Sequence, residues 1–153
     1  MARLVRTDVL VAGGGMAGLS AALFLAWHGV SCVLVERRAD TLVHPRARGL
    51  HARTVELLRG VGLEEAVAAA GASVATSYRI LTVESLAGRE LFAFPRPPED
   101  DGLSPCRMSF CQQDRLEPLL RGRAETLGAD IRFGVPLRSF AQSPGGVTAR
   151  VGD

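Results

Sequence analysis

The sequence predicts an α/β fold, a Rossmann-like three-layer domain with a parallel sheet, added β-hairpins and an incomplete C-terminal part. Three observations predict it: a continuous apolar run at residues 8–12, a glycine cluster that leads into an amphipathic stretch, and a second apolar run at 32–36. Continuous apolar runs are typical of strands covered on both faces of a parallel sheet. Strand, helix and strand in this order form a βαβ unit, whose crossover is right-handed almost without exception.

The stretch after the glycines predicts the first helix, because its apolar residues recur at helical spacing. Gly29 follows this stretch and is well placed to end the helix. The apolar face consists of Leu19, Ala22, Leu23 and Ala26.

The middle of the sequence predicts two further helices and a hairpin. After a loop that contains Arg46, one helix has apolar side chains at 57, 58 and 61, and a short helix at 64–70 ends at Gly71. Residues 76–85 and 91–94 flank an Ala87-Gly88 turn and predict an antiparallel hairpin. The proline-rich stretch 95–105 predicts an exposed loop.

The C-terminal part predicts a helix, a strand and a second hairpin. Proline is tolerated in the first turn of a helix and breaks it further in, so Pro118 predicts a helix that begins close to Asp114. This start leaves Gln113 at the N-terminal mouth of the helix. Residues 130–133 then predict a strand, and 135–141 and 147–151 flank a Ser-Pro-Gly-Gly turn.

Composition limits the classes of protein that fit. The chain has 153 residues, 47% hydrophobic and 22% charged, which is typical of a globular domain. A net charge of +2 is too small to indicate a nucleic-acid partner, and we expect no membrane partner because glycines interrupt the apolar N-terminal stretch. Three cysteines without a CxxC spacing favour a reduced, cytoplasmic setting. The histidines and cysteines show no zinc-site spacing, so we expect no metal.

The glycine cluster carries the first functional signal. In Gly13-x-Gly15-x-x-Gly18, the first glycine allows a tight turn, the second lets backbone N–H groups approach a pyrophosphate, and the third packs helix on strand. Glu36 ends the second predicted strand, where an acid that binds ribose hydroxyls is expected, and its charge disfavours NADP. NAD and the ADP half of FAD both remain, and a purely structural turn is the alternative to a dinucleotide site.

Three segments together resemble a known family. They are VLVAGGGMAGLSAALFLAWHGVSCVLVERR, HPRARGLHARTVELLRGVGL and QQDRLEPLLRGRAETLGADIRFG. In this order they resemble the class A flavin monooxygenases, the aromatic hydroxylases of the para-hydroxybenzoate hydroxylase type. The middle segment is most similar to the subgroup that acts on phenols and aromatic polyketides.

The resemblance implies a role for each matching residue. Glu36 would bind the adenosine ribose of FAD, and Arg37 would lie near the adenine or ribose, unless it is a solvated surface arginine. Arg46 would reach the pyrophosphate region, with an ordinary exposed loop arginine as the alternative. Gln113 would hydrogen-bond the flavin side, although Gln112 leaves the register uncertain by one residue and a capping role for either remains open. The pyrophosphate would lie on Gly13, Gly14, Gly15, Met16, Ala17 and Gly18.

The resemblance also implies a division of the chain. Residues 1–75 would form the βαβ FAD-binding unit with the helices that follow it, 76–110 a β-hairpin and loop insertion, and 111–153 a helix, a return strand and a C-terminal hairpin of the same domain. Further flavin motifs and most of the substrate domain would lie beyond residue 153, so the sequence names no catalytic residue. We expect this chain alone to bind FAD weakly and to hydroxylate nothing.

The function predicted by the resemblance is that of the FAD-binding portion of a monooxygenase that hydroxylates a small aromatic molecule with NAD(P)H and O₂. One alternative is an NAD-dependent oxidoreductase on the same scaffold, which the Arg46 loop and the Gln113 helix disfavour. A second is a non-catalytic module, a truncated FAD-binding or interaction domain. Exposed apolar surface on so short a chain would also allow a homodimer.

Overall fold

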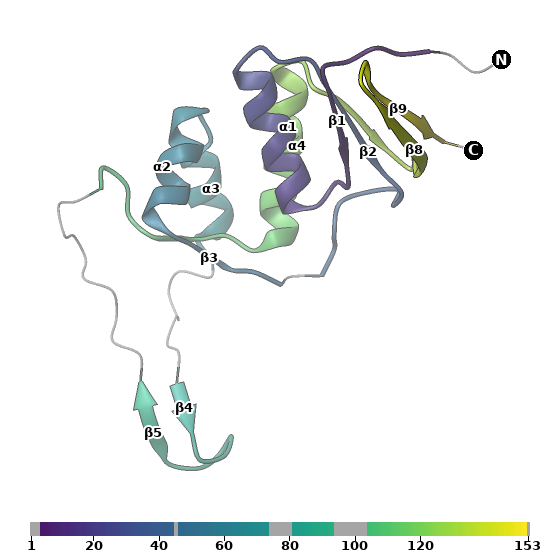
Figure 1. The fold of residues 1–153 in the computed structure, drawn as a ribbon. Coiled ribbons are helices and arrows are strands. Elements are labelled where there is room, and N and C mark those ends of the chain that lie inside the picture. Colours follow the sequence, from purple (N-terminus) through teal and green to yellow (C-terminus); the bar gives the residue numbers. More distant parts are fainter. Residues whose placement is uncertain (1–3, 45, 74–80, 94–103, 153) are drawn as a thin grey trace. The chain divides into compact units, whose positions relative to one another are not determined.

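The computed structural model describes residues 4–44, 46–73, 81–93 and 104–152 (Figure 1). The chain divides into two compact units. Residues 1–47 and 112–153 form the first, which we call the sheet unit, and residues 48–111 form the second, the middle unit. The boundaries expected from the sequence near residues 75 and 110 remain predictions about domain organisation.

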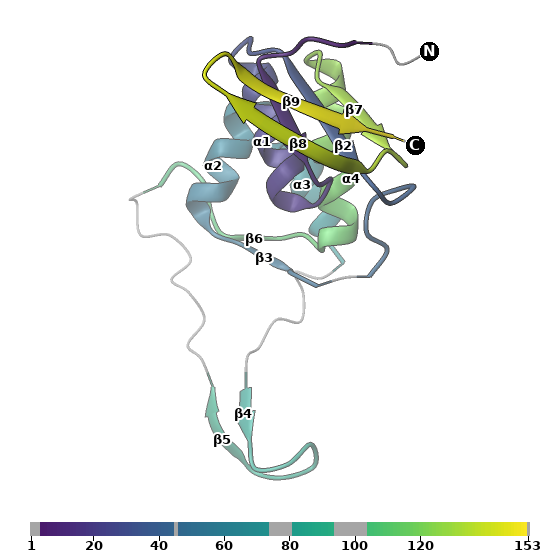
Figure 2. The ribbon, with the colours of Figure 1, turned by 45° about the vertical axis from the view of Figure 1, so that its right-hand side comes forward.

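The sheet unit is built on three parallel strands in the order β1-β2-β7. All five residues of the central strand β2 are buried, as its continuous apolar sequence predicts. The parallel sheet confirms the predicted α/β class, and Figure 2 shows β7 beside β2 although residues 37–129 separate them in the sequence. The strands are β1 (Val9–Ala12), β2 (Cys32–Glu36) and β7 (Asp130–Phe133).

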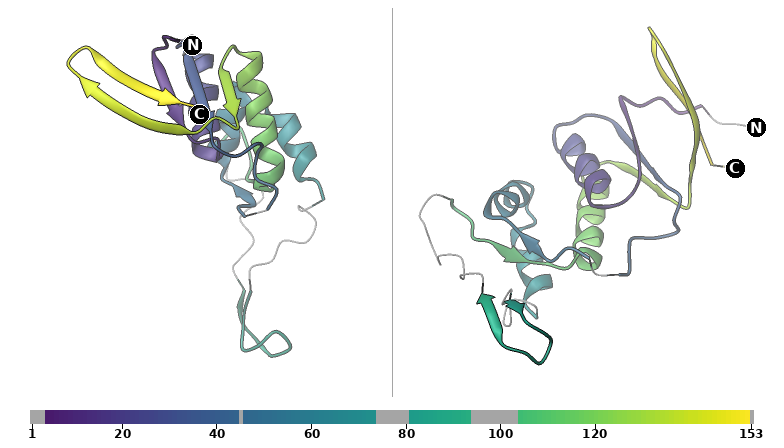
Figure 3. Two further views of the ribbon diagram at one scale, coloured as in Figure 1. Left: turned by 90° about the vertical axis from the view of Figure 1, so that its right-hand side faces the viewer. Right: turned by 60° about the horizontal axis from the view of Figure 1, so that its bottom comes forward.

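Two helices of the sheet unit, α1 (Met16–Trp27) and α4 (Gln113–Thr126), pack against each other. Figure 3 shows both on one side of the parallel sheet and the C-terminal hairpin on the other, which gives the three predicted layers. The predicted apolar face of α1 is confirmed at Leu19, Ala22 and Leu23, which are fully buried, whereas the fourth predicted residue, Ala26, is only partly buried.

The prediction about Pro118 was wrong. Helix α4 begins at Gln113, so Pro118 lies five residues after the first helical residue and inside the helix. Its ring removes the N–H that would bond to the carbonyl of Asp114. The helix continues because burial on its other face outweighs this loss: Leu116, Leu120 and Ala124 are all buried. The predicted start of the helix is confirmed to within one residue.

The C-terminal hairpin pairs β8 (Leu137–Ser143) with β9 (Gly146–Val151) in antiparallel register. The turn therefore consists of residues 144 and 145, two residues fewer than the predicted Ser-Pro-Gly-Gly turn. Most of the hairpin's residues are exposed, including the large apolar side chains of Phe140 and Val147.

The middle unit contains the two predicted helices and the predicted hairpin. A pair of two-residue strands, which the sequence pattern did not predict, lies before the first helix and after the hairpin. Predicted hairpin residues 76–80 and 94, and most of the predicted loop 95–105, lie outside the described residues. The elements are β3 (Gly49–Leu50), α2 (Ala52–Gly60), α3 (Glu64–Gly71), β4 (Leu81–Val83), β5 (Glu90–Ala93) and β6 (Ser109–Phe110).

Within the described ranges, no helix combines the length and the apolar character needed to cross a membrane.

Candidate cofactor-binding site

The glycine loop connects the end of β1 to the start of α1. Gly13 has a φ of +115°, a conformation that L side chains rarely adopt, and its N–H donates to the Val35 carbonyl at 2.8 Å. A Cβ on Gly18 would lie 1.9 Å from the carbonyl oxygen of Gly13. The loop and the first turn of α1 therefore approach each other more closely than any side chain allows, as the third glycine of the motif predicts.

The N-terminus of α1 is open to an anion. Gly15 is the N-cap residue and supplies no side-chain cap, and the first turn contains no acidic residue. The first hydrogen bond inside the helix runs from Leu19 N–H to Gly15 O at 2.9 Å. The N–H groups that precede Leu19 in the helix have no intrahelical partner, and the helix dipole favours negative charge at this end. A phosphate group fits this donor set.

Glu36 closes over the glycine loop from the end of β2. Its Oε2 accepts the Gly14 N–H at 2.7 Å and its Oε1 accepts the Arg38 N–H at 2.9 Å, with the Arg38 Nε 3.8 Å away. A Cβ on Gly14 would lie 2.8 Å from the Glu36 Cβ, so the missing side chain makes this contact possible.

The environment of Glu36 favours its charged form. Burial raises the pKa of this carboxyl, but the N–H donors of Gly14 and Arg38 and the charges of Arg38 and Arg37 lower it more. The resulting pKa lies below its ordinary value. A carboxylate has about four acceptor positions, so Glu36 retains capacity for the hydroxyl donors of a ribose.

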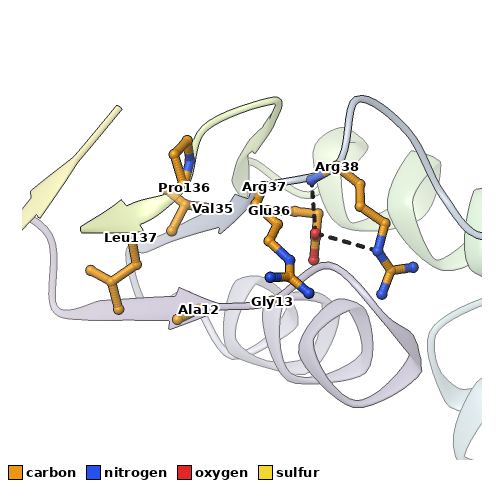
Figure 4. A pocket seen from close by; sticks show the side chains of 8 residues that line it. All are labelled: Ala12, Gly13, Val35, Glu36, Arg37, Arg38, Pro136 and Leu137. Atoms are coloured by element: carbon orange, nitrogen blue, oxygen red, sulfur yellow. Dashed lines mark hydrogen bonds and ion pairs between the residues drawn. The ribbon is translucent and has the colours of Figure 1, made fainter. Parts of the chain in front are cut away.

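A pocket of about 300 Å³ opens beside Glu36, at the carboxyl ends of the parallel strands (Figure 4). Ligands of open α/β sheets bind at this edge. Three of the predicted site residues, Gly13, Glu36 and Arg37, line the pocket. The other lining residues are Ala12, Val35, Arg38, Pro136 and Leu137.

Sequence reasoning missed Pro136 and Leu137 because it did not establish which strand lies next to β2. The segment after β7 is attached to the end of β2 by two hydrogen bonds, from Val135 N–H to Glu36 O at 2.8 Å and from Gly134 N–H to Arg38 O at 2.7 Å. The strand order β1-β2-β7 is the signal that would have found both residues.

Arg46 and Gln113 do not line this pocket, and Arg46 is exposed. Gln113 is the first residue of α4, and its N–H donates to the carbonyl of Ala47 at 3.0 Å. The structure thus brings the backbone next to Arg46 to the N-terminus of α4. Gln112 occupies the N-cap position and makes no side-chain cap hydrogen bond.

Glu117 is another residue that sequence reasoning missed. It lies one helical turn after Gln113, is 1% exposed, and accepts the Gln113 Nε2 amide at 2.7 Å. The sequence gives no signal for it, because only the structure shows that this glutamate of the amphipathic helix is buried. In the described part of the chain, no group of three or more His, Cys, Asp and Glu side chains could hold a metal ion.

Comparison with known proteins identifies the cofactor class. A family model described as a FAD binding domain matches residues 6–153. The chain is 44% identical over 148 residues to a putative polyketide hydroxylase of Streptomyces halstedii, covering 94% of this chain and 27% of that protein. It is also 44% identical over 152 residues to 4-methyl-5-nitrocatechol 5-monooxygenase of a Burkholderia species, covering 97% of this chain and 28% of that protein. The chain thus spans less than a third of the length of these relatives.

Solved structures give the same assignment. The flavin-dependent monooxygenase PieE, in complex with FAD and substrate, matches with a TM-score of 0.85 at 34% identity over 98% of this chain and 27% of that one. Aklavinone-11 hydroxylase, in a ternary complex with FAD and aklavinone, matches with a TM-score of 0.78 at 36% identity over 98% of this chain and 30% of that one. The resemblance to flavin monooxygenases is confirmed, and FAD is the dinucleotide of the two left open by the glycine loop. The chain belongs to the FAD-binding domain family.

Proposed function

We propose that this chain is the cofactor-holding portion of a flavin monooxygenase that hydroxylates an aromatic substrate, phenolic or polyketide, with NAD(P)H and O₂. The functions named for the relatives support this proposal, since they include a polyketide hydroxylase and a nitrocatechol monooxygenase. The observation that carries it is the contact between Glu36 and Gly14, which sets a charged ribose acceptor beside the uncapped N-terminus of α1.

In this proposal, different residues bind different parts of FAD. The backbone N–H groups of residues 13–18 hold the pyrophosphate, and Glu36 holds the adenosine ribose with Arg37 beside it. Pro136 and Leu137 offer an apolar wall to the adenine in the same pocket. Arg46 reaches the pyrophosphate, and Gln113 hydrogen-bonds the flavin side.

FAD supplies the redox chemistry when it is bound, and the residues of this chain bind and orient it. None of them is assigned to the substrate. We propose a small aromatic substrate because aklavinone occupies one neighbouring structure and nitrocatechol is named for one relative.

The setting we propose is the cytoplasm, without a nucleic-acid or membrane partner. The cysteines at positions 32, 106 and 111 are free and buried, which suits a reducing compartment. A homodimer, which the sequence also suggested, would be detected by analytical ultracentrifugation of the purified chain.

A ligand titration tests the cofactor half of the proposal. The purified chain is titrated with FAD while flavin fluorescence is followed, and AMP and NAD are added as competitors. AMP should displace FAD, because both would place an adenosine at Glu36. NAD should compete no better than AMP, because the flavin-side contacts would be lost. An NAD affinity equal to that of FAD would instead favour the NAD-dependent oxidoreductase.

A segment exchange tests the activity half. The matching 152 residues of the nitrocatechol monooxygenase, to which this chain is 44% identical, are replaced by this chain. The chimera should purify with bound FAD and oxidise NAD(P)H in the presence of the nitrocatechol. A folded chimera without flavin would contradict the proposal.

A further inference from the structure

The carboxylate of Glu117 is buried between two hydrogen-bond donors that carry no charge. Its Oε1 accepts the side-chain amide of Gln113 at 2.7 Å, and its Oε2 accepts the backbone N–H of Leu42 at 2.9 Å. The residue is 1% exposed, and a Cβ on Gly15 would lie 3.8 Å from its Oε1. Burial of a carboxyl group is costly unless its oxygens are hydrogen-bonded, so both contacts matter for the fold around it.

Glu117 is the middle of three contacts between α4 and the segment that follows β2. Gln113, Glu117 and Arg121 are spaced four residues apart and so share one face of α4. Gln113 N–H donates to Ala47 O at 3.0 Å, Glu117 accepts from Leu42, and Arg121 Nη1 lies 3.2 Å from Asp40 Oδ1. This face therefore holds Asp40, Leu42 and Ala47, which lie on either side of Arg46 or close to it in the sequence.

The Glu117 contact also decides which way the Gln113 amide faces. Gln113 Nε2 donates to Glu117 Oε1, and a glutamine amide has a donating end and an accepting end. The NH₂ group of Gln113 must therefore face Glu117, which leaves its carbonyl oxygen and one N–H for another partner.

We propose that Glu117 is a positioning residue of the FAD site, which presents the carbonyl oxygen of Gln113 to the cofactor and holds the segment with Arg46 in place. This inference rests on the proposed function, because the cofactor contact of Gln113 belongs to that proposal. Glu117 itself touches no cofactor in this scheme.

The substitution Glu117→Gln tests the orientation directly. The Leu42 N–H is a backbone donor and cannot turn around, so a glutamine at position 117 must present its carbonyl oxygen to Leu42 and its NH₂ group to Gln113. Gln113 then turns its own carbonyl oxygen toward position 117, and its NH₂ group faces the cofactor. We expect FAD binding to weaken roughly three- to tenfold, the usual effect of one lost hydrogen bond. AMP binding, read by NMR shifts at the Glu36 pocket, should not change.

The double variant Gln113→Glu with Glu117→Gln supplies the rescue. The carboxylate at position 113 accepts from the new NH₂ group and keeps one oxygen toward the cofactor, and the net charge equals that of the natural chain. FAD affinity should recover most of the loss. Glu65→Gln is the control, because that exposed carboxylate lies in α3 of the middle unit, away from the candidate site residues, and should leave FAD affinity unchanged.

The outcomes separate this inference from the proposed function. If the natural chain binds no FAD, the proposed function fails and the inference fails with it. If the natural chain binds FAD, the inference is overturned by any of three results. These are an unchanged FAD affinity in Glu117→Gln, an equal weakening of FAD and AMP binding, and a double variant no better than the single one. Thermal melts of all four proteins show whether each variant is folded.

Discussion

At the scale of single residues, Gly18 is the position where a methyl group would do most damage to the cofactor loop. Its Cβ would lie 1.9 Å from a backbone oxygen, and backbone cannot rotate away as a side-chain end can. We expect Gly18→Ala to destabilise the chain by about 1–3 kcal/mol, the usual cost of overpacking. FAD binding should be lost as well, because the loop has to move. Urea unfolding and flavin fluorescence measure the two effects.

Gly122 offers the matched control for that substitution. It lies in α4, no atom other than the neighbouring backbone of the helix lies within 4 Å of its Cβ position, and its φ is not positive. Gly122→Ala should therefore stabilise the chain by about 0.5–1 kcal/mol, the helix-propensity difference between the residues. Equal destabilisation by both substitutions would contradict the steric argument at Gly18.

The lowered pKa of Glu36 predicts that the stability of the folded chain depends on pH. Its folded-state pKa lies below its ordinary value of 4.5, so the ionised carboxylate stabilises the folded chain above that pH. This stabilisation is lost as the pH falls from about 4.5 through the folded-state pKa, because the folded carboxyl then takes up its proton. Unfolding of the natural chain and of Glu36→Gln is compared at about pH 7 and about pH 3.5. The stability difference should shrink at the lower pH, and a constant difference would exclude ionisation of Glu36 as its source.

At the scale of elements, Pro118 lowers the stability of α4 and can be replaced. Pro118 is exposed, so its replacement loses little packing, while Pro118→Ala returns an N–H to the Asp114 carbonyl. Relief of an interior proline is worth about 3 kcal/mol, offset by about 0.4–1 kcal/mol of unfolded-state entropy. We expect a net gain of about 2–2.5 kcal/mol in urea unfolding. A loss of stability would show that the ring makes a contact that helix geometry alone does not reveal.

The elements also show how far sequence patterns reach. The strands and helix of the βαβ unit were predicted from local sequence patterns. Burial on both faces of β2 gives a continuous apolar run, and burial on one face of α1 gives apolar residues at helical spacing. The two-residue strands β3 and β6 were not predicted, since their pairing is a tertiary contact without a period. The same limit applies to the site: the glycines and Glu36 follow a motif, whereas Leu137 and Glu117 depend on which elements lie side by side.

At the scale of the whole molecule, the pieces that form the candidate site all belong to the sheet unit. The glycine loop, Glu36, the Arg46 segment and the start of α4 lie within residues 1–47 and 112–153. The described residues of the middle unit, within 48–111, contribute none of the lining residues of the pocket. A ligand that binds only a folded unit stabilises that unit according to its concentration relative to the dissociation constant. FAD should therefore stabilise the sheet unit selectively if the two units open separately.

Three buried thiols make that selectivity measurable. Cys32 lies in β2 of the sheet unit, where burial raises the pKa of its thiol and so reduces its reactive thiolate, while Cys106 and Cys111 lie in the middle unit. Each reacts with an alkylating reagent only when its unit opens. Labelling followed by peptide mass spectrometry should show that saturating FAD slows modification of Cys32 at least tenfold and leaves the other two within about twofold. Equal slowing of all three would show that both units open together, because FAD would then stabilise them as one cooperative structure.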